Sequence, residues 1–187
     1  MKLALCLFIA LIALGGCAAV PVDSAAALRD WVCGQGGEIV DARLARIAAI
    51  GEALPAEGLT TPRTFHVLNS TAFAAYSWDS GDIFLSASLI DAATDDEIAA
   101  AIAHEMGHLI NAGSASGQGA AGLRGTDASL VVEKRADAAG IAVLQKTSRP
   151  PRALISLLTK VRAASVSAVS KEEIQRRIDL LRKQLAI

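Results

Sequence analysis

The segment His104-Glu105-Met106-Gly107-His108 constrains the fold of this 187-residue chain more than any other feature. It lies in a stretch with a helical pattern, where a separation of four residues places two side chains on one face. Two imidazoles at this spacing can hold one metal ion, and the glutamate beside them can take a proton from a water molecule. The spacing therefore predicts His104 and His108 as metal ligands and Glu105 as catalytic base, an arrangement typical of zinc metallopeptidases.

A third ligand is expected, because catalytic zinc usually takes three protein ligands. Glu133 and Asp137 stand at i and i+4 of the next predicted helix, on a face that the following apolar residues Ile141 and Leu144 predict to point inward. A buried carboxylate needs a partner, and a metal ion is one. We predict Glu133 as the third ligand, and Asp137 as the acceptor of a hydrogen bond from the free ring nitrogen of a bound histidine. The alternative is a solvated helix face whose acids pair with Lys134 or Arg135.

The pattern of the remaining sequence predicts an α+β fold, with a small sheet beside a mostly helical body. The sequence predicts three strands, the last two joined by a turn, because residues that favour strands gather at 64–68, 73–78 and 82–85. Helical patterns cover the segments 25–31, 39–50, 94–111, 128–146, 153–161 and about 170–185. His66 falls in the first strand, where we expect it to be satisfied by local partners.

Local signals mark where some of these helices begin. Thr94 and Glu97 have the spacing of a capping box, which predicts the start of the helix that carries the metal motif. Ser170 and Glu173 have the same spacing and predict the start of the last helix. Residues 113–125 are rich in glycine, alanine and serine, which indicates a loop.

The N-terminus has the pattern of an export signal. One charge, Lys2, precedes an apolar run at 3–14 that is shorter than the roughly 20 residues needed to span a bilayer. The run ends in Leu-Gly-Gly-Cys17, which resembles a bacterial lipobox and predicts a lipid anchor on Cys17. We therefore expect a signal peptide at 1–16 and a single metallopeptidase domain at 17–187. The alternative is an ordinary secretory signal cut near Ala18.

This pattern predicts that the protein is located in the bacterial cell envelope. Because Ala18 rather than an aspartate follows Cys17, we expect an outer-membrane anchor that faces the periplasm. The formal net charge is −1 and no basic tail is present, so nucleic acid is not an expected partner. Cys33 is expected to be an idle or half-buried thiol, and the oligomeric state stays open.

The combined motifs resemble those of the HtpX-like gluzincin metallopeptidases, which include the Caax-prenyl-protease, OMA-type and BepA-type enzymes. The resemblance rests on H-E-M-G-H followed by E-x-x-x-D, on residues 70–74, which are similar to the N-A-F-A stretch of the family, and on 81–85 and 95–108. Thr71 replaces the usual asparagine, and the downstream His-Pro is absent, with Ser170-Lys171-Glu172 near its place. Arg177 with the isoleucine after it resembles the R-I that follows. The resemblance implies a zincin-like domain.

Together these observations predict a zinc-dependent endopeptidase that holds one Zn²⁺ per chain and acts on unfolded or damaged envelope proteins. The polypeptide substrate is expected to add itself to an exposed edge strand. That strand is predicted to contain Ile83, Phe84, Leu85 and Ser86. One alternative is a non-cleaving zinc-binding lipoprotein that acts as a chaperone or adaptor in envelope assembly. Another is a structural lipoprotein in which the histidine motif is accidental, and metal content would separate it from the others.

Overall fold

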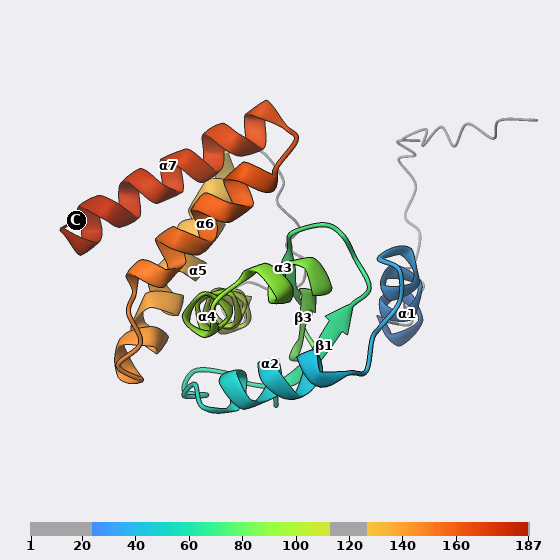
Figure 1. Ribbon diagram of the computed structural model, residues 1–187. Helices are drawn as coiled ribbons and strands as arrows, with labels where there is room; N and C mark the ends of the chain where they lie inside the picture. Colours follow the sequence, from blue (N-terminus) through green and yellow to red (C-terminus); the bar gives the residue numbers. More distant parts are fainter. Residues whose placement is uncertain (1–23, 113–126, 187) are drawn as a thin grey trace, which may run out of the picture.

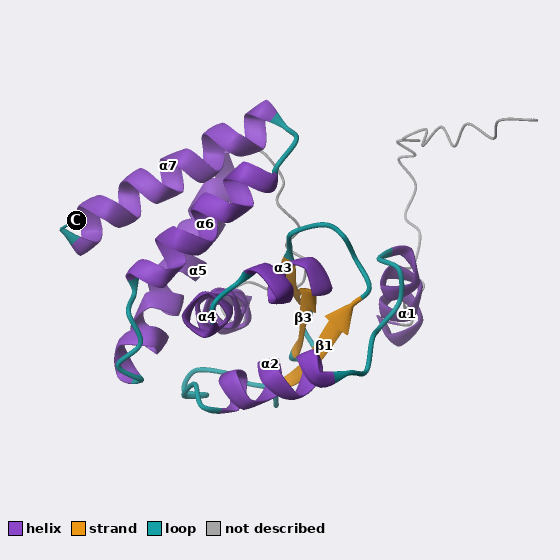
Figure 2. Cartoon of the chain, viewed as in Figure 1, coloured by secondary structure: helices purple, strands orange, loops and turns teal. Residues whose placement is uncertain are grey.

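The computed structural model describes residues 24–112 and 127–186 of the chain. The predicted signal peptide at 1–16, the lipidation site Cys17 and the predicted loop at 113–125 lie outside the described residues. The elements are α1 (Ser24–Gly34), α2 (Ala42–Glu52), β1 (Thr64–Leu68), β2 (Ala75–Ser77), β3 (Asp82–Ser86), α3 (Ala87–Ala92), α4 (Asp95–Ala112), α5 (Asp127–Lys146), α6 (Arg152–Ala164) and α7 (Ala168–Leu185). The helical majority and the small sheet confirm the predicted α+β class (Figure 2).

Helix α4 is the centre of the molecule. Figure 1 shows it end-on, with the sheet and α2 on one side and α5, α6 and α7 on the other. Its start is fixed by the predicted capping box: the backbone N–H of Thr94 donates to Glu97 Oε2 at 2.8 Å, and that of Glu97 donates to Thr94 Oγ1 at 3.3 Å. Ile98, Ile102 and Met106 of α4 are fully buried in the core. The metal motif is therefore carried by the most enclosed helix of the described chain.

The sheet is mixed, with the strand order β1-β3-β2. β3 pairs in parallel with β1 on one side and antiparallel with β2 on the other. The prediction that Ile83 to Ser86 form an exposed edge strand is therefore wrong, because the backbone groups of β3 are used on both sides. Within the described residues β2 is an edge of the sheet, and it is the edge next to α4.

The two faces of the sheet are covered by different helices. Ile83 and Leu85 point into the core that α2 and α4 complete. Phe84 points to the opposite face, where its ring centroid lies 5.2 Å from that of Trp31 in α1. This arrangement holds β2 between α1 and α4, because Tyr76 in β2 also contacts Trp31, at 5.1 Å between centroids.

The predicted strand 73–78 is shorter in the structure, at Ala75–Ser77, and two further local predictions differ. The last helix begins at Ala168, two residues before the predicted box, because Ser167 is its N-cap and accepts a hydrogen bond from the backbone N–H of Ser170 at 3.3 Å. The prediction that Ser170 and Glu173 form a capping box at the start of this helix is therefore wrong. The short helix α3 was not predicted; it follows β3 directly, and Ser86 caps it by accepting from the N–H of Leu89.

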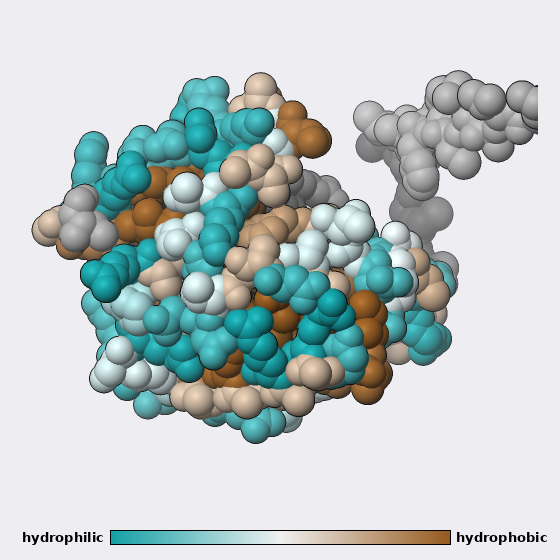
Figure 3. Space-filling view, viewed as in Figure 1, coloured by the Kyte–Doolittle hydropathy of each residue, from teal (hydrophilic) through white to brown (hydrophobic). Residues whose placement is uncertain are grey.

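The surface of the described chain is mostly hydrophilic on the face seen in Figure 3. Apolar side chains are exposed singly or in small groups, of which Val166 at 99% and Val169 at 61% stand at the turn between α6 and α7. Among the described helices, none has the length and apolarity that crossing a bilayer requires.

Candidate metal centre

Close packing of α4 against α5 creates the site. A Cβ atom placed on Gly107 would lie 2.4 Å from the backbone oxygen of Ala136, and one on Gly140 would lie 3.1 Å from the backbone of Ala103. Only residues without a side chain permit two helices to approach so closely. The glycine inside the His-Glu-Met-Gly-His segment therefore brings the predicted acids of α5 against the two histidines of α4.

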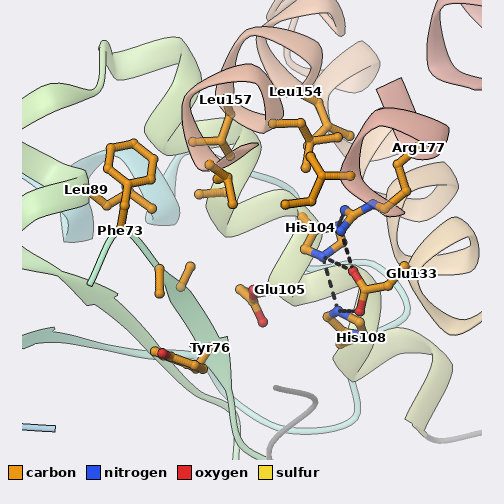
Figure 4. A pocket seen from close by; sticks show the side chains of 16 residues that line it. Phe73, Tyr76, Leu89, His104, Glu105, His108, Glu133, Leu154, Leu157 and Arg177 are labelled. Carbon is orange, nitrogen blue, oxygen red and sulfur yellow. Dashed lines mark hydrogen bonds and ion pairs between the residues drawn. The ribbon is translucent and has the colours of Figure 1, made fainter. Parts of the chain in front are cut away.

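The structure brings His104, His108 and Glu133 together with their polar atoms facing one point (Figure 4). The Nε2 atoms of the two histidines are 3.1 Å apart. Glu133 Oε2 lies 3.3 Å from Nε2 of His104, and Glu133 Oε1 lies 3.5 Å from Nε2 of His108. Ligand atoms held about 2.0–2.1 Å from a tetrahedral zinc ion lie about 3.3 Å from one another. The three predicted ligands thus have the mutual spacing of a tetrahedral metal site.

Asp137 lies behind His104, on the side away from this point. Its Oδ1 is 2.9 Å from Nδ1 of His104, so it can accept the ring N–H and leave Nε2 free to face the cluster. The guanidinium of Arg177, from α7, binds Asp137 through two hydrogen bonds of 2.6 and 2.9 Å. The same guanidinium reaches Glu133 Oε2 at 2.7 Å. Arg177 therefore holds both acids of α5 in place.

Three buried acids and one buried guanidinium group lie in and beside this cluster. Glu105, Glu133 and Asp137 are all at least 94% buried, and Arg177 is the buried cation beside them. Burial disfavours a charge on His104, but hydrogen bonds to Asp137 and Glu133 outweigh it and raise the pKa of His104 to about 10. Burial also opposes ionisation of Glu133, yet its contacts with His104 and Arg177 lower its pKa. The cluster is thus built to surround positive charge, which fits a bound metal ion.

Glu105 faces the cleft rather than the three-residue cluster (Figure 4). Ser77, at the end of β2, donates a hydrogen bond of 2.8 Å from Oγ to Glu105 Oε2. Burial and the charge of Glu105 raise the pKa of Tyr76, the neighbouring residue in β2. The carboxylate is therefore held between the edge strand and the metal cluster, where a general base would be needed.

A cleft of about 480 Å³ is lined by the metal cluster, by Glu105 and by β2, which forms one of its walls. Alternate residues of an antiparallel strand direct their backbone groups to opposite sides. Since Ala74 and Trp78 bond to β3, the N–H and C=O groups of Ala75 and Ser77 point to the open edge. Within the described residues, the edge of the sheet beside α4 is therefore β2 and not the predicted strand Ile83 to Ser86.

His66 has the local role expected from the sequence. Its ring lies between Glu38 at 3.0 Å and Asp82 at 2.9 Å, and stacks on Phe84 at 4.5 Å between centroids. It does not belong to the group of potential metal ligands found among the described residues. Cys33 is an exposed free thiol.

Two residues of the site, Ser77 and Arg177, were not predicted. Arg177 carried a detectable signal, because it lies on the apolar stripe that Ile174, Ile178 and Leu181 form along α7. A cation on an inward face needs a buried acid as partner, and that partner could have been sought in α5. Ser77 carried no comparable signal, since a serine near a turn is common.

Comparison with protein families gives a match over part of the chain. Residues 41–124 match the model of peptidase family M48. The match confirms the resemblance to HtpX- and BepA-like gluzincin metallopeptidases, and it includes the sheet and the whole of α4 but ends before Glu133. No curated protein sequence matches the chain.

Proposed function

Starting from the match to peptidase family M48, we propose that this protein is a zinc-dependent endopeptidase of the bacterial envelope that cleaves unfolded or damaged proteins. The observation that carries the proposal is the shared cleft. His104, His108 and Glu133 line the same cavity as Glu105 and the edge strand β2. A metal site, a base and a peptide-binding edge are the parts that metal-assisted peptide hydrolysis requires.

Zinc is the metal that this set of donors fits. Two imidazole nitrogens and one carboxylate, spaced 3.1 to 3.5 Å apart, match a catalytic site with three protein ligands. When bound, zinc acts as a Lewis acid that polarises the scissile carbonyl and lowers the pKa of a water molecule to about 7. Asp137 fixes His104 in the tautomer whose Nε2 is available, and Arg177 fixes Asp137.

Glu105 is the general base and then the general acid in this proposal. Its carboxylate takes a proton from the attacking water and passes it to the leaving amine. The hydrogen bond from Ser77 uses one lone pair of Oε2 and holds the carboxylate of Glu105 so that it faces the cleft. Burial of Glu105 keeps bulk water from competing for the proton.

The peptide is proposed to add to β2 as a further strand. The outward backbone groups of Ala75 and Ser77 provide the hydrogen bonds, and Ser77 links this edge to the base. Such binding depends on hydrogen bonds to the backbone of the substrate. It requires an extended segment, which folded proteins seldom expose. This supports unfolded or damaged polypeptides as the substrate class.

The envelope address rests on the lipobox-like segment that ends at Cys17. A lipid on Cys17 is proposed to anchor the domain to the outer membrane, facing the periplasm. We expect Cys17→Ser to move the protein from the membrane fraction to the soluble fraction of cells. Recovery of equal amounts in the membrane fraction would contradict this address.

The activity is tested by incubating the zinc-loaded protein with casein, an unfolded protein. We expect cleavage by the wild type, loss of cleavage in Glu105→Gln with zinc retained, and unchanged cleavage in Glu57→Gln, which alters an exposed glutamate instead. Equal cleavage by the wild type and Glu105→Gln would contradict the role of Glu105. Zinc binding without any cleavage would favour the non-cleaving chaperone or adaptor.

A further inference from the structure

Helix α1 lies on the face of the sheet that points away from α4 (Figure 1). Through Trp31 it contacts three aromatic rings of the sheet. The distances between ring centroids are 5.1 Å to Tyr76, 5.7 Å to Trp78 and 5.2 Å to Phe84. The match to peptidase family M48 begins at residue 41, so α1 lies outside the matched region. The aromatic contacts therefore join a helix outside that region to the edge strand β2.

The chain that follows α1 is fixed to β1 by its backbone. The N–H of Ile39 donates a hydrogen bond of 2.8 Å to the backbone oxygen of Val67. At the end of β1, the N–H of Asn69 donates one of 2.9 Å to the backbone oxygen of Gly37. These bonds hold α1 beside the sheet independently of its side chains. A change of the Trp31 ring therefore leaves α1 attached and alters the aromatic contacts alone.

The two faces of β2 carry different side chains. Ser77 is buried on the α4 face, where it bonds to Glu105. Because successive side chains of a strand point to opposite faces, Tyr76 and Trp78 on either side of Ser77 point to the α1 face. Both rings are half-buried, so part of each stays open. Tyr76 also lines the cleft, and Figure 4 shows it and the metal cluster on opposite sides of Glu105.

A peptide that adds to β2 extends both of these faces. The backbone groups that point to the open edge belong to Ala75 and Ser77, so in an antiparallel pair the substrate residue opposite Tyr76 makes no ladder hydrogen bonds. At such a position the facing Cα atoms are about 4.5 Å apart, and diagonal neighbours are about 7–8 Å apart. The side chain of this substrate residue therefore packs on Tyr76 and reaches Trp78. The substrate residues before and after it point to the α4 face.

We propose that Tyr76 and Trp78, held in place by Trp31 of α1, form an aromatic subsite for the substrate side chain that points away from the metal cluster. The inference rests on the proposed peptidase activity and adds a preference for an aromatic residue at that position. Aromatic pairs across neighbouring strands stabilise a sheet more than pairs of small residues do. Trp31 is a positioning residue, because it touches the two rings and not the substrate.

Intrinsic fluorescence reports on this subsite directly, because Trp31 and Trp78 are the two tryptophans of the chain. The zinc-loaded variant Glu105→Gln is titrated with extended peptides that lack tryptophan and carry either phenylalanine or serine at one position, which is moved along the peptide. We expect phenylalanine at one position to change the fluorescence and to lower Kd by about 3- to 10-fold relative to serine. Equal Kd values at every position, or no binding of any peptide, would overturn the subsite.

Three variants, made in the Glu105→Gln protein, assign the preference to these rings. Trp78→Ala should remove it. Trp31→Ala should weaken it, whereas Trp31→Phe keeps a ring at the contact and should retain most of it. Asp30→Asn is the matched control, because Asp30 is the exposed neighbour of Trp31 in α1, and it should leave the ratio of Kd values unchanged. Circular dichroism and zinc content check the fold, and an unchanged ratio in folded Trp78→Ala would overturn the subsite.

Cleavage by the wild type separates this inference from the proposed function. The same phenylalanine should lower KM by about 3- to 10-fold and change kcat by about 2-fold or less, because its ring lies on the face away from the reacting atoms. Cleavage with equal KM values for phenylalanine and serine would overturn the subsite and leave the peptidase intact. Binding with the expected preference but without any cleavage would overturn the peptidase and support the subsite.

Discussion

Replacement of Arg177 by methionine should strongly destabilise the metal-free protein. The guanidinium is 96% buried and bonds to Asp137 at 2.6 and 2.9 Å and to Glu133 at 2.7 Å. Methionine has a similar length and is apolar, so Arg177→Met keeps much of the packing while removing the charge. It leaves two buried carboxylates of like charge with His104 as their remaining cationic partner.

The size of the effect follows from these contacts. At an effective dielectric constant of 20, a pair of unit charges about 4 Å apart attracts by about 4 kcal/mol. Arg177 makes two such pairs, and loss of its own desolvation cost offsets part of that attraction. Removal of one partner from a buried ion pair costs about 3–5 kcal/mol. That is a large share of the roughly 5–15 kcal/mol by which folded domains are stable.

The assay is urea unfolding of the metal-free protein at neutral pH. Arg176→Met is the matched control, because Arg176 is the adjacent residue but is half-exposed and pairs with the exposed Glu172. We expect a loss of about 3–5 kcal/mol for Arg177→Met and about 1 kcal/mol or less for Arg176→Met. Equal losses in the two variants would refute the inference that Arg177 holds the acids of the site.

Three further changes test other parts of the structure. Gly107→Ala should force α5 away from α4, because its Cβ would lie 2.4 Å from the backbone of Ala136, and metal content after dialysis should fall about 10-fold or more; unchanged content would contradict the close approach. Ser77→Ala should free the carboxylate of Glu105, so we expect kcat for a peptide to fall while bound zinc stays constant, and an unchanged kcat would exclude this positioning role. Glu97 is buried, which raises its pKa, but hydrogen bonds from neighbouring side chains lower the pKa below the ordinary 4.5. Because the unfolded chain takes up the proton first, this stabilisation is lost as the pH falls through 4.5 and below. Unfolding of Glu97→Gln should therefore depend less on pH in this range than that of the wild type, and parallel curves would contradict the assignment.

The parts of the fold that were predictable from sequence are those with local signals. Thr94 and Glu97 cap α4 through residues three apart, so their pattern is visible without any tertiary contact. The strand 64–68 has the observed bounds, because alternation of inward and outward residues is also local. The pairing of Glu133 with the histidines of α4 was accessible because an acid on an inward face must have a partner.

The parts that were not predictable depend on contacts between distant segments. The order of strands is set by which faces the helices cover, so the pattern of residues 82–86 cannot tell a central strand from an edge. Arg177 lies 40 residues from Asp137, and its place on an apolar stripe indicated burial without identifying the partner. Ser167 and Ser170 are both acceptable N-caps, and the path of the chain from α6 decides between them.

Metal content is the most direct test of the central claim, that His104, His108 and Glu133 hold one catalytic ion. Wild type, Glu133→Gln and Glu38→Gln are loaded with zinc, dialysed and analysed for metal, with circular dichroism as a check on folding. Glu38 is the matched control, because its carboxylate contacts His66 outside the cluster. We predict one zinc ion per chain in the wild type and Glu38→Gln, and at least about 10-fold weaker retention in folded Glu133→Gln. Equal zinc content in all three proteins would contradict the site.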